Sequence, residues 1–109
     1  MTHTNTSDSP EGLIVYIDPD LEEIVPGFLD NRRKDVQILA TCIEKEHWDT
    51  IRLLGHRMKG DGGGYGFEAI SAIGHDLEQA ALRRDLLTIR ERTQNLTRFL
   101  SRVRVVYRR

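Results

Sequence analysis

The sequence predicts an all-α protein: an up-down four-helix bundle with a short extra N-terminal helical turn. Three observations favour this fold class. Apolar residues recur at spacings of three and four in four successive stretches, which is the periodicity of helices with one buried face. No stretch of useful length alternates between apolar and polar residues, as a half-buried strand would. The connections between the stretches are short, as expected of antiparallel neighbours in a bundle.

The length of 109 residues suits one domain with a modest core. Residues 1–12 are polar and rich in Thr and Ser, and they are predicted to be a disordered N-terminal lead; residues 13–109 are predicted to form the single helical domain. No apolar run is long enough to span a membrane, and no signal-peptide pattern opens the chain. The single cysteine, Cys42, is expected to be a buried thiol, and a cytoplasmic location fits it best.

The extra helical turn is predicted to start at Asp18 and Pro19, because aspartate caps helix N-termini and proline suits the first helical position. Pro26 disfavours helical geometry at Val25, so this turn should end before the first long helix begins. That helix is expected to end near Glu46. Its apolar positions are Phe28, Leu29, Val36, Leu39, Ala40 and Ile43.

The second long helix is predicted to start near Trp48, and the third follows a glycine-rich run. The third helix shows a clean apolar stripe. The stripe consists of Phe67, Ile70, Ile73, Gly74, Leu77, Ala80 and Ala81. Asp85 should cap the fourth helix, which is predicted to run to the end of the chain. Its seam is Leu86, Ile89, Thr93, Leu96, Leu100, Val103 and Tyr107.

Charge is distributed unevenly along the chain. Residues 1–82 carry seven basic and fifteen acidic side chains, whereas residues 83–109 carry nine arginines against two acidic residues. A nucleic-acid-binding bundle is therefore one alternative. However, Arg98 and Arg102 lie opposite the seam while Arg92 and Arg104 fall towards its flanks, and no aromatics are interleaved for base stacking. We expect no nucleic acid among the partners.

The second helix carries the most informative residues, beginning at His56. Its buried direction is set by Ile51, Leu54, Gly55 and Met58. At about 100° per residue, His56 lies about 140° from Ile51 and is predicted to face solvent. Lys59 and Gly60 follow at i+3 and i+4, so the three form one surface site.

Glycines and cations surround this histidine. A glycine inside a helix costs about 1 kcal/mol relative to alanine, so a patch containing Gly60 and Gly63 indicates close approach by another protein's active site. Leu53 would supply an apolar contact on the solvent side. Arg52 and Lys59 would supply charge for a phosphoryl group. The glycine run is also explained by a helix C-cap and loop, and both interpretations stay open here.

These residues resemble the histidine-containing phosphotransfer (HPt) domains of multistep phosphorelays, over roughly residues 13–107. The most specific part is the run from His56 to Gly60, supported by Gly66 and by Leu77-Glu78-x-Ala80. The resemblance implies that His56 is the phospho-accepting residue, that Lys59 helps to neutralise the phosphoryl group, and that Gly60 leaves room for the partner. Met58 stands where leucine is more frequent, and Asp61 where serine or alanine is common.

The resemblance implies a phosphorelay signalling intermediate. His56 would accept a phosphoryl group from a receiver-domain aspartyl phosphate and pass it to another receiver. The partners would be response-regulator receiver domains, hybrid sensor histidine kinases or both. We expect no cofactor in this chain, because Mg²⁺ would belong to the receiver, and no kinase or ATPase activity, because the phosphate-binding loop sequence is missing. A monomer is favoured over a dimer.

Two further alternatives come from other classes of function. The chain could be a non-catalytic HPt-like bundle that only binds a partner, since exposed helical histidines are commonly just solvated. A metal site is suggested by His75 and Glu78, which are spaced i, i+3 as in di-metal bundles. Such a site needs a second pair, which the sequence lacks, so no metal ligand is assigned.

Overall fold

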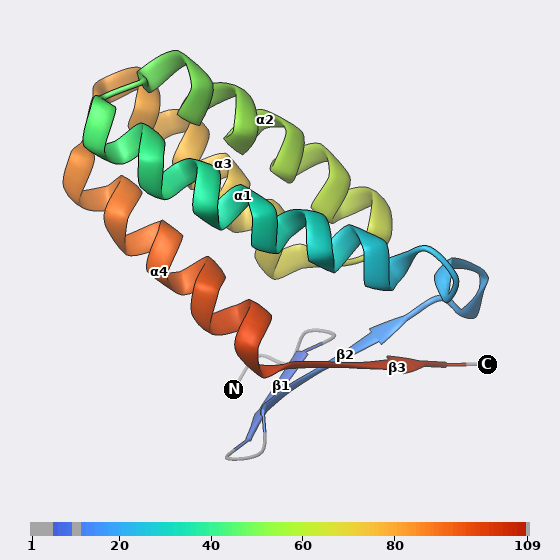
Figure 1. The fold of residues 1–109 in the computed structure, drawn as a ribbon. Coiled ribbons are helices and arrows are strands. Elements are labelled where there is room, and N and C mark those ends of the chain that lie inside the picture. The colour runs from blue at the N-terminus through green and yellow to red at the C-terminus, as the bar shows by residue number, and fades with distance from the viewer. Residues whose placement is uncertain (1–5, 10–11, 109) are drawn as a thin grey trace.

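Four long helices and a small sheet make up the structure (Figure 1), a computed structural model that describes residues 6–9 and 12–108. The elements are β1 (Thr6–Ser9), β2 (Gly12–Ile17), the 3-10 turn η1 (Pro19–Leu21), α1 (Val25–Lys45), α2 (Trp48–Tyr65), α3 (Glu68–Arg83), α4 (Leu86–Arg102) and β3 (Val103–Tyr107). The predicted four-helix bundle with an extra N-terminal turn is confirmed.

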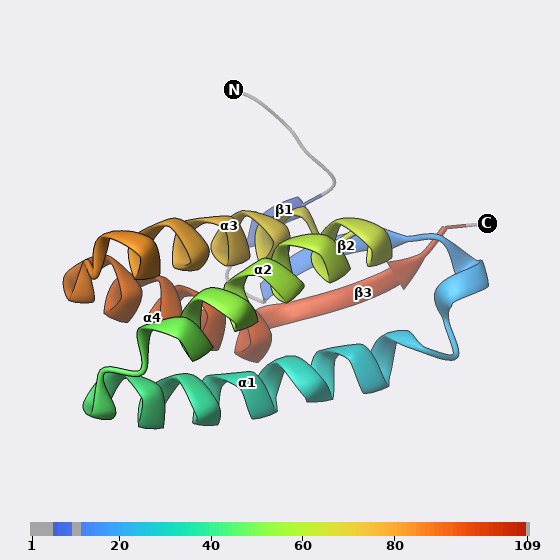
Figure 2. The same ribbon diagram turned by 90° about the horizontal axis from the view of Figure 1, so that it is seen from above.

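The helices form a closed bundle in which each one packs against two others. Helix α1 contacts α2 and α4, and α3 contacts the same two helices on the other side. Figures 1 and 2 show the four helices side by side, with the sheet near the start of α1 and the end of α4. This is the up-down arrangement expected from short connections.

The helix ends follow their capping residues. The side chain of Asp18 accepts a hydrogen bond from the backbone of Asp20 at 2.8 Å, which starts η1 as predicted. Helix α1 begins at Val25, with Pro26 in its first turn, where a missing N–H leaves no bond unmade. Helix α4 begins after Asp85, whose carboxylate accepts from the backbone of Thr88 at 3.2 Å.

The predicted core is largely confirmed. Every residue of the α3 stripe is buried, and so are the four residues that set the buried face of α2 and the thiol of Cys42. On α1, however, Ala40 is exposed and Val36 only half-buried. The periodicity of α4 did not include Phe99, which is buried and lies 6.4 Å from the Phe67 ring, centroid to centroid. A wide core face admits more residues than a narrow seam.

The three-stranded sheet corrects the prediction for both ends of the chain. Helix α4 stops at Arg102, and the next five residues form β3 instead of continuing the helix. Strand β3 pairs in parallel with β2, Leu13 beside Val103 and Ile17 beside Tyr107. Three β-branched valines in five residues favour this extended conformation. Val103 and Tyr107 do pack against the core, but from a strand.

The segment predicted to be a disordered lead is described only in part. Residues Thr6–Ser9 form β1, which pairs antiparallel with β2, and Gly12 is the first residue of β2. In these positions the structure has strands where a disordered lead was predicted. Residues 1–5 and 10–11 lie outside the described residues, so the prediction there is untested.

Candidate functional site

Helix α2 presents His56 to solvent. Its apolar residues Ile51, Leu54 and Met58 are buried, as is Gly55, and they fix the rotation of the helix about its axis. The side chain of His56, on the other side, is 61% exposed. The orientation inferred from helical periodicity is therefore confirmed.

Two glycines let α2 and α3 lie unusually close together. A Cβ placed on Gly55 would lie 2.7 Å from the carbonyl oxygen of Gly74, and a Cβ on Gly74 would lie 2.5 Å from the backbone nitrogen of Lys59. Both distances are well below van der Waals contact, so the backbones meet only because neither position carries a side chain. The crossing places the turn of α3 that carries Glu78 beside the turn of α2 that carries His56.

Glu78 connects the histidine and the lysine of the site. One carboxylate oxygen, Oε2, lies 2.9 Å from Nδ1 of His56, and the other, Oε1, accepts a hydrogen bond from Nζ of Lys59 at 2.9 Å. The Glu78 side chain is only 13% exposed, whereas that of Lys59 is 40% exposed. The carboxylate thus forms the floor of the site, with the cation and the imidazole at the surface.

This arrangement fixes which nitrogen of His56 carries a lone pair. Hydrogen bonds from Lys59 and from His56 lower the pKa of the Glu78 carboxyl, so it is ionised at neutral pH and only accepts hydrogen bonds. Nδ1 of His56 must therefore donate its hydrogen to Glu78. In the neutral imidazole the lone pair is then on Nε2, which bonds no other residue in the described part of the chain. The imidazole is a surface nucleophile with a defined tautomer.

The sequence did not predict that Glu78 contacts His56 and Lys59; it indicated Glu78 only as part of the family pattern and as a possible metal ligand. The signal lay in the two buried glycines. Lys59 follows Gly55 by four residues, and Glu78 follows Gly74 by four residues. Because α2 and α3 run antiparallel, each glycine lies opposite the residue four positions after the other glycine: a Cβ on Gly55 would lie 2.6 Å from the backbone nitrogen of Glu78, and one on Gly74 would lie 2.5 Å from that of Lys59.

The model of the Hpt domain family matches residues 23–105 of the chain. The chain belongs to this family. Hpt domains carry out histidine phosphotransfer in phosphorelays, where they interact with receiver domains and kinases. No curated protein and no solved structure is significantly similar to the chain.

In this Hpt domain the glycine run is helical and not a loop. Helix α2 continues through it to Tyr65, and the C-cap is Gly66, whose φ of 86° suits glycine. A Cβ on Gly60 would meet nothing within 4 Å, and one on Gly63 would make only ordinary contact with Ser71. Gly62 differs, because its Cβ would lie 2.6 Å from the backbone of Ser71. Gly62 therefore serves helix packing, and Gly60 leaves open space near His56.

The predicted docking residues lie on the exposed side of α2. Leu53 is 42% exposed, an unusual position for a large apolar side chain. Arg52 is half-buried, and Gly63 is exposed. These positions agree with the predicted surface; their role in docking stays a prediction.

Asp61 has a cationic neighbour on α1. Its carboxylate lies 3.7 Å from the guanidinium of Arg32, which also pairs with Asp35 at 2.8 Å. The Arg32 side chain is 11% exposed and lies over the ring of Phe28. Part of the negative charge that the sequence placed beside the site is therefore balanced from the α1 side.

The described residues do not support the metal alternative. They contain no group of three or more potential His, Cys, Asp or Glu ligands, and Glu78 is already occupied by His56 and Lys59. His75 is exposed. Among the same residues, no helix is both long and apolar enough to cross a membrane.

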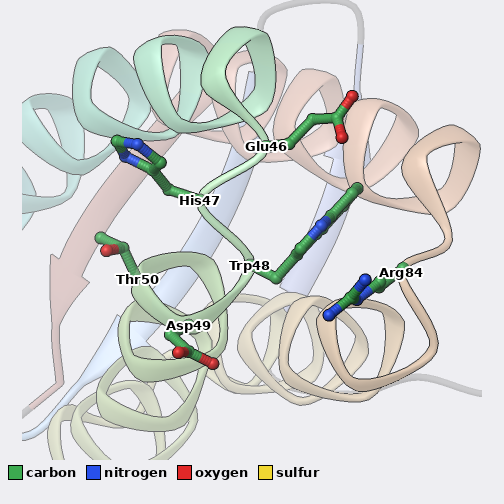
Figure 3. Close-up of a pocket in the computed structure, with 6 residues that line it drawn as sticks. All are labelled: Glu46, His47, Trp48, Asp49, Thr50 and Arg84. Carbon is green, nitrogen blue, oxygen red and sulfur yellow. The ribbon is translucent and has the colours of Figure 1, made fainter.

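A separate hollow lies at the far end of the bundle (Figure 3). It has a volume of about 360 Å³ and is lined by Glu46, His47, Trp48, Asp49, Thr50 and Arg84. Trp48 lies between the side chains of Glu46 and Arg84, where the α1–α2 and α3–α4 connections meet. His56 lies eight residues along α2 from Trp48, or about 12 Å at the rise of a helix. The hollow is therefore distinct from the His56 site.

Proposed function

We propose that this Hpt domain is a phosphorelay intermediate that accepts a phosphoryl group on His56 from a receiver-domain aspartyl phosphate and passes it to another receiver. The observation that carries the proposal is the hydrogen bond from Nδ1 of His56 to Glu78. It leaves the lone pair on Nε2 of a largely exposed imidazole. The side chain can thus enter a partner's active site without rearrangement.

In the proposed step, Nε2 attacks the phosphorus in line with the bond to the aspartyl oxygen. The N–P bond forms as the P–O bond breaks, and the electron pair of that bond returns to the receiver's carboxylate. Such transfer depends mainly on positioning and on stabilising charge. Glu78 balances the positive charge that develops on the imidazole, since it accepts from Nδ1.

The remaining residues would act on the incoming group and its carrier. Lys59 would neutralise the phosphoryl oxygens, since its ammonium sits beside His56 on the shared carboxylate. Gly60 would give the receiver room to approach, and Leu53, Arg52 and Gly63 would form the docking surface. The receiver would bring Mg²⁺, so this chain would need no cofactor of its own. A cytoplasmic location and a monomeric state stay predictions from the sequence.

The test is incubation with a phosphorylated receiver domain, comparing the wild type with His56→Gln. We expect acid-labile label on the wild type and none on His56→Gln. His47→Gln is a matched control, because it removes an exposed histidine at the start of the same helix and should be labelled normally. Equal labelling of wild type and His56→Gln would show that another residue accepts the label and would refute the role of His56, whereas no labelling with any receiver would favour a bundle that only binds partners.

A further inference from the structure

A groove between α3 and α4 is separate from the His56 site. Its volume is about 440 Å³, and it opens to solvent along the two helices. Small side chains on α3, Ala69 and Ala72, leave space between the helices. Ile73 and Phe99 form its apolar floor, together with Leu13 from the start of β2. We call it the α3–α4 groove.

Arginines from α4 form the rim of the α3–α4 groove. Arg92, Arg98 and Arg102 all line it, and Asp76 is the acidic residue among its lining. Asp76 pairs with Arg92 at 3.1 Å, so these two charges compensate each other. Arg98 is exposed and projects its charge to solvent. Three arginines of α4 thus line one groove, although helical periodicity placed Arg98 and Arg102 opposite the seam and Arg92 towards its flank.

An apolar floor with a cationic rim fits one kind of occupant. We propose that the α3–α4 groove binds an amphipathic helix of a partner protein whose carboxylates flank its apolar stripe. Apolar residues at i, i+3 and i+4 would cover Ala69, Ala72 and Phe99, and a flanking carboxylate would pair with the exposed Arg98.

A second copy of this chain does not supply such a helix. The large apolar side chains exposed in the described residues are Ile24, Ile38, Leu53, Leu82, Leu87 and Val106. No two of them lie three or four residues apart on one helix, so no described helix presents an apolar stripe. The occupant must therefore come from another protein.

The groove is continuous with the surface beside His56. Ala72 and Asp76 line both the groove and a shallow hollow formed by Lys59, Gly63 and Ser71. A helix seated in the groove would therefore extend towards the proposed docking surface, which is where a partner would gain from a second contact. The groove's binding does not depend on whether His56 accepts a phosphoryl group, so the two proposals are tested separately.

The test uses a fluorescein-labelled synthetic helix with leucines at helical spacing and glutamates beside them, titrated with the full chain. We expect binding that weakens as salt is added, and amide shifts in the ¹⁵N-labelled protein at Ala69, Ala72 and Asn95. Arg98→Glu should weaken binding by about tenfold or more. Arg90→Glu makes the same charge change on an exposed residue of α4 that does not line the groove, and it should bind normally.

Several outcomes would overturn the proposal. These are no binding of the glutamate peptide, amide shifts confined to other surfaces, or equal weakening by Arg90→Glu and Arg98→Glu. Equal affinity for a peptide with lysines in place of the glutamates would refute the charge complementarity. Concentration-dependent self-association that Arg98→Glu abolishes, measured by sedimentation, would make a second copy the occupant.

Discussion

Helix α2 carries glycines on two of its sides, and the two sets meet different surroundings. Gly55 and Gly62 face α3, where a Cβ would fall within 2.7 Å of backbone atoms. Gly60 and Gly64 face solvent, where a Cβ would touch nothing within 4 Å. The first set holds two helices close enough for Glu78 to reach His56. In the second set, Gly60 leaves the surface next to the imidazole open, and Gly64 leaves open the surface about two turns from His56. Glycine thus has two roles in α2: it permits the close helix packing that positions Glu78, and it leaves the solvent-exposed surface of the helix free of side chains.

The largest effect, on stability, is expected where glycines allow the backbones of α2 and α3 to come into contact. Gly55→Ala should lower the free energy of unfolding by about 3 kcal/mol, because its Cβ would lie 2.6 Å from the backbone nitrogen of Glu78 and the two packed helices would have to move apart to accept it. Gly64→Ala, on the open side, should leave stability unchanged or raise it by up to about 1 kcal/mol. Urea denaturation followed by circular dichroism measures both. Equal stabilities of the two variants would remove the distinction between the two sets of glycines.

A smaller effect, on transfer and not on stability, is expected at Gly60. Gly60→Glu places a bulky anion in open space near His56, where it would obstruct the receiver and repel the phosphoryl group. We expect phosphotransfer to slow by about tenfold or more, or about 1.4 kcal/mol in the barrier, with the helical content retained. Rapid-quench labelling with a phosphorylated receiver measures the rate. Gly27→Glu adds the same charge at an open position of α1, and its rate should match the wild type.

The smallest expected effect concerns the carboxylate that the close helix packing brings into place. The pKa of Glu78 in the folded protein is lowered from the ordinary value of 4.5, chiefly by the hydrogen bond from Lys59. The ionised carboxylate therefore stabilises the fold above pH 4.5, and this contribution is lost as the pH falls through the lower folded-state pKa. Glu78→Gln should be less stable than the wild type at pH 7, and the difference should shrink as the pH falls below 4.5.

Urea denaturation of the wild type and Glu78→Gln over a pH series measures this difference. If the wild type and Glu78→Gln differed in stability by the same amount at every pH, the charge of Glu78 would make no contribution and only its packing would matter. Asp76→Asn offers a control on the same helix, since it alters a carboxylate that pairs with Arg92 and not with His56. Only Glu78→Gln should also slow transfer to His56.

Much of the helical part of the fold was predictable because each helix carries its own signal. Apolar spacing gave the buried faces, and capping residues such as Asp18 and Asp85 marked the starts. Strand β3 was not predictable in the same way. Val103 and Tyr107 are four residues apart, which suits a helix seam as well as it suits one face of a strand. Strand β2 has apolar residues on both faces, so no alternation marked it.

The site was predictable to the extent that it lies on a single helix. The exposure of His56, the neighbouring Lys59 and the open space at Gly60 all follow from positions along α2. Glu78 comes from α3, so its contact with His56 depends on how two helices cross. Gly55 and Gly74 lie in the buried stripes of α2 and α3, but the periodicity of each helix alone does not show which residues of the other helix they contact. The balancing of Asp61 by Arg32 likewise requires α1 to lie beside α2.

The pairing of β2 with β3 has a consequence for the order of folding. Leu13 and Val103 are partners although 90 residues separate them in the sequence, whereas three of the four helix pairs join neighbours along the chain. Local contacts form early, and a distant pairing becomes less costly once intervening structure has brought its ends together. The sheet should therefore assemble after the bundle, and protection of the β3 amides from hydrogen exchange would report that all four helices are already in place.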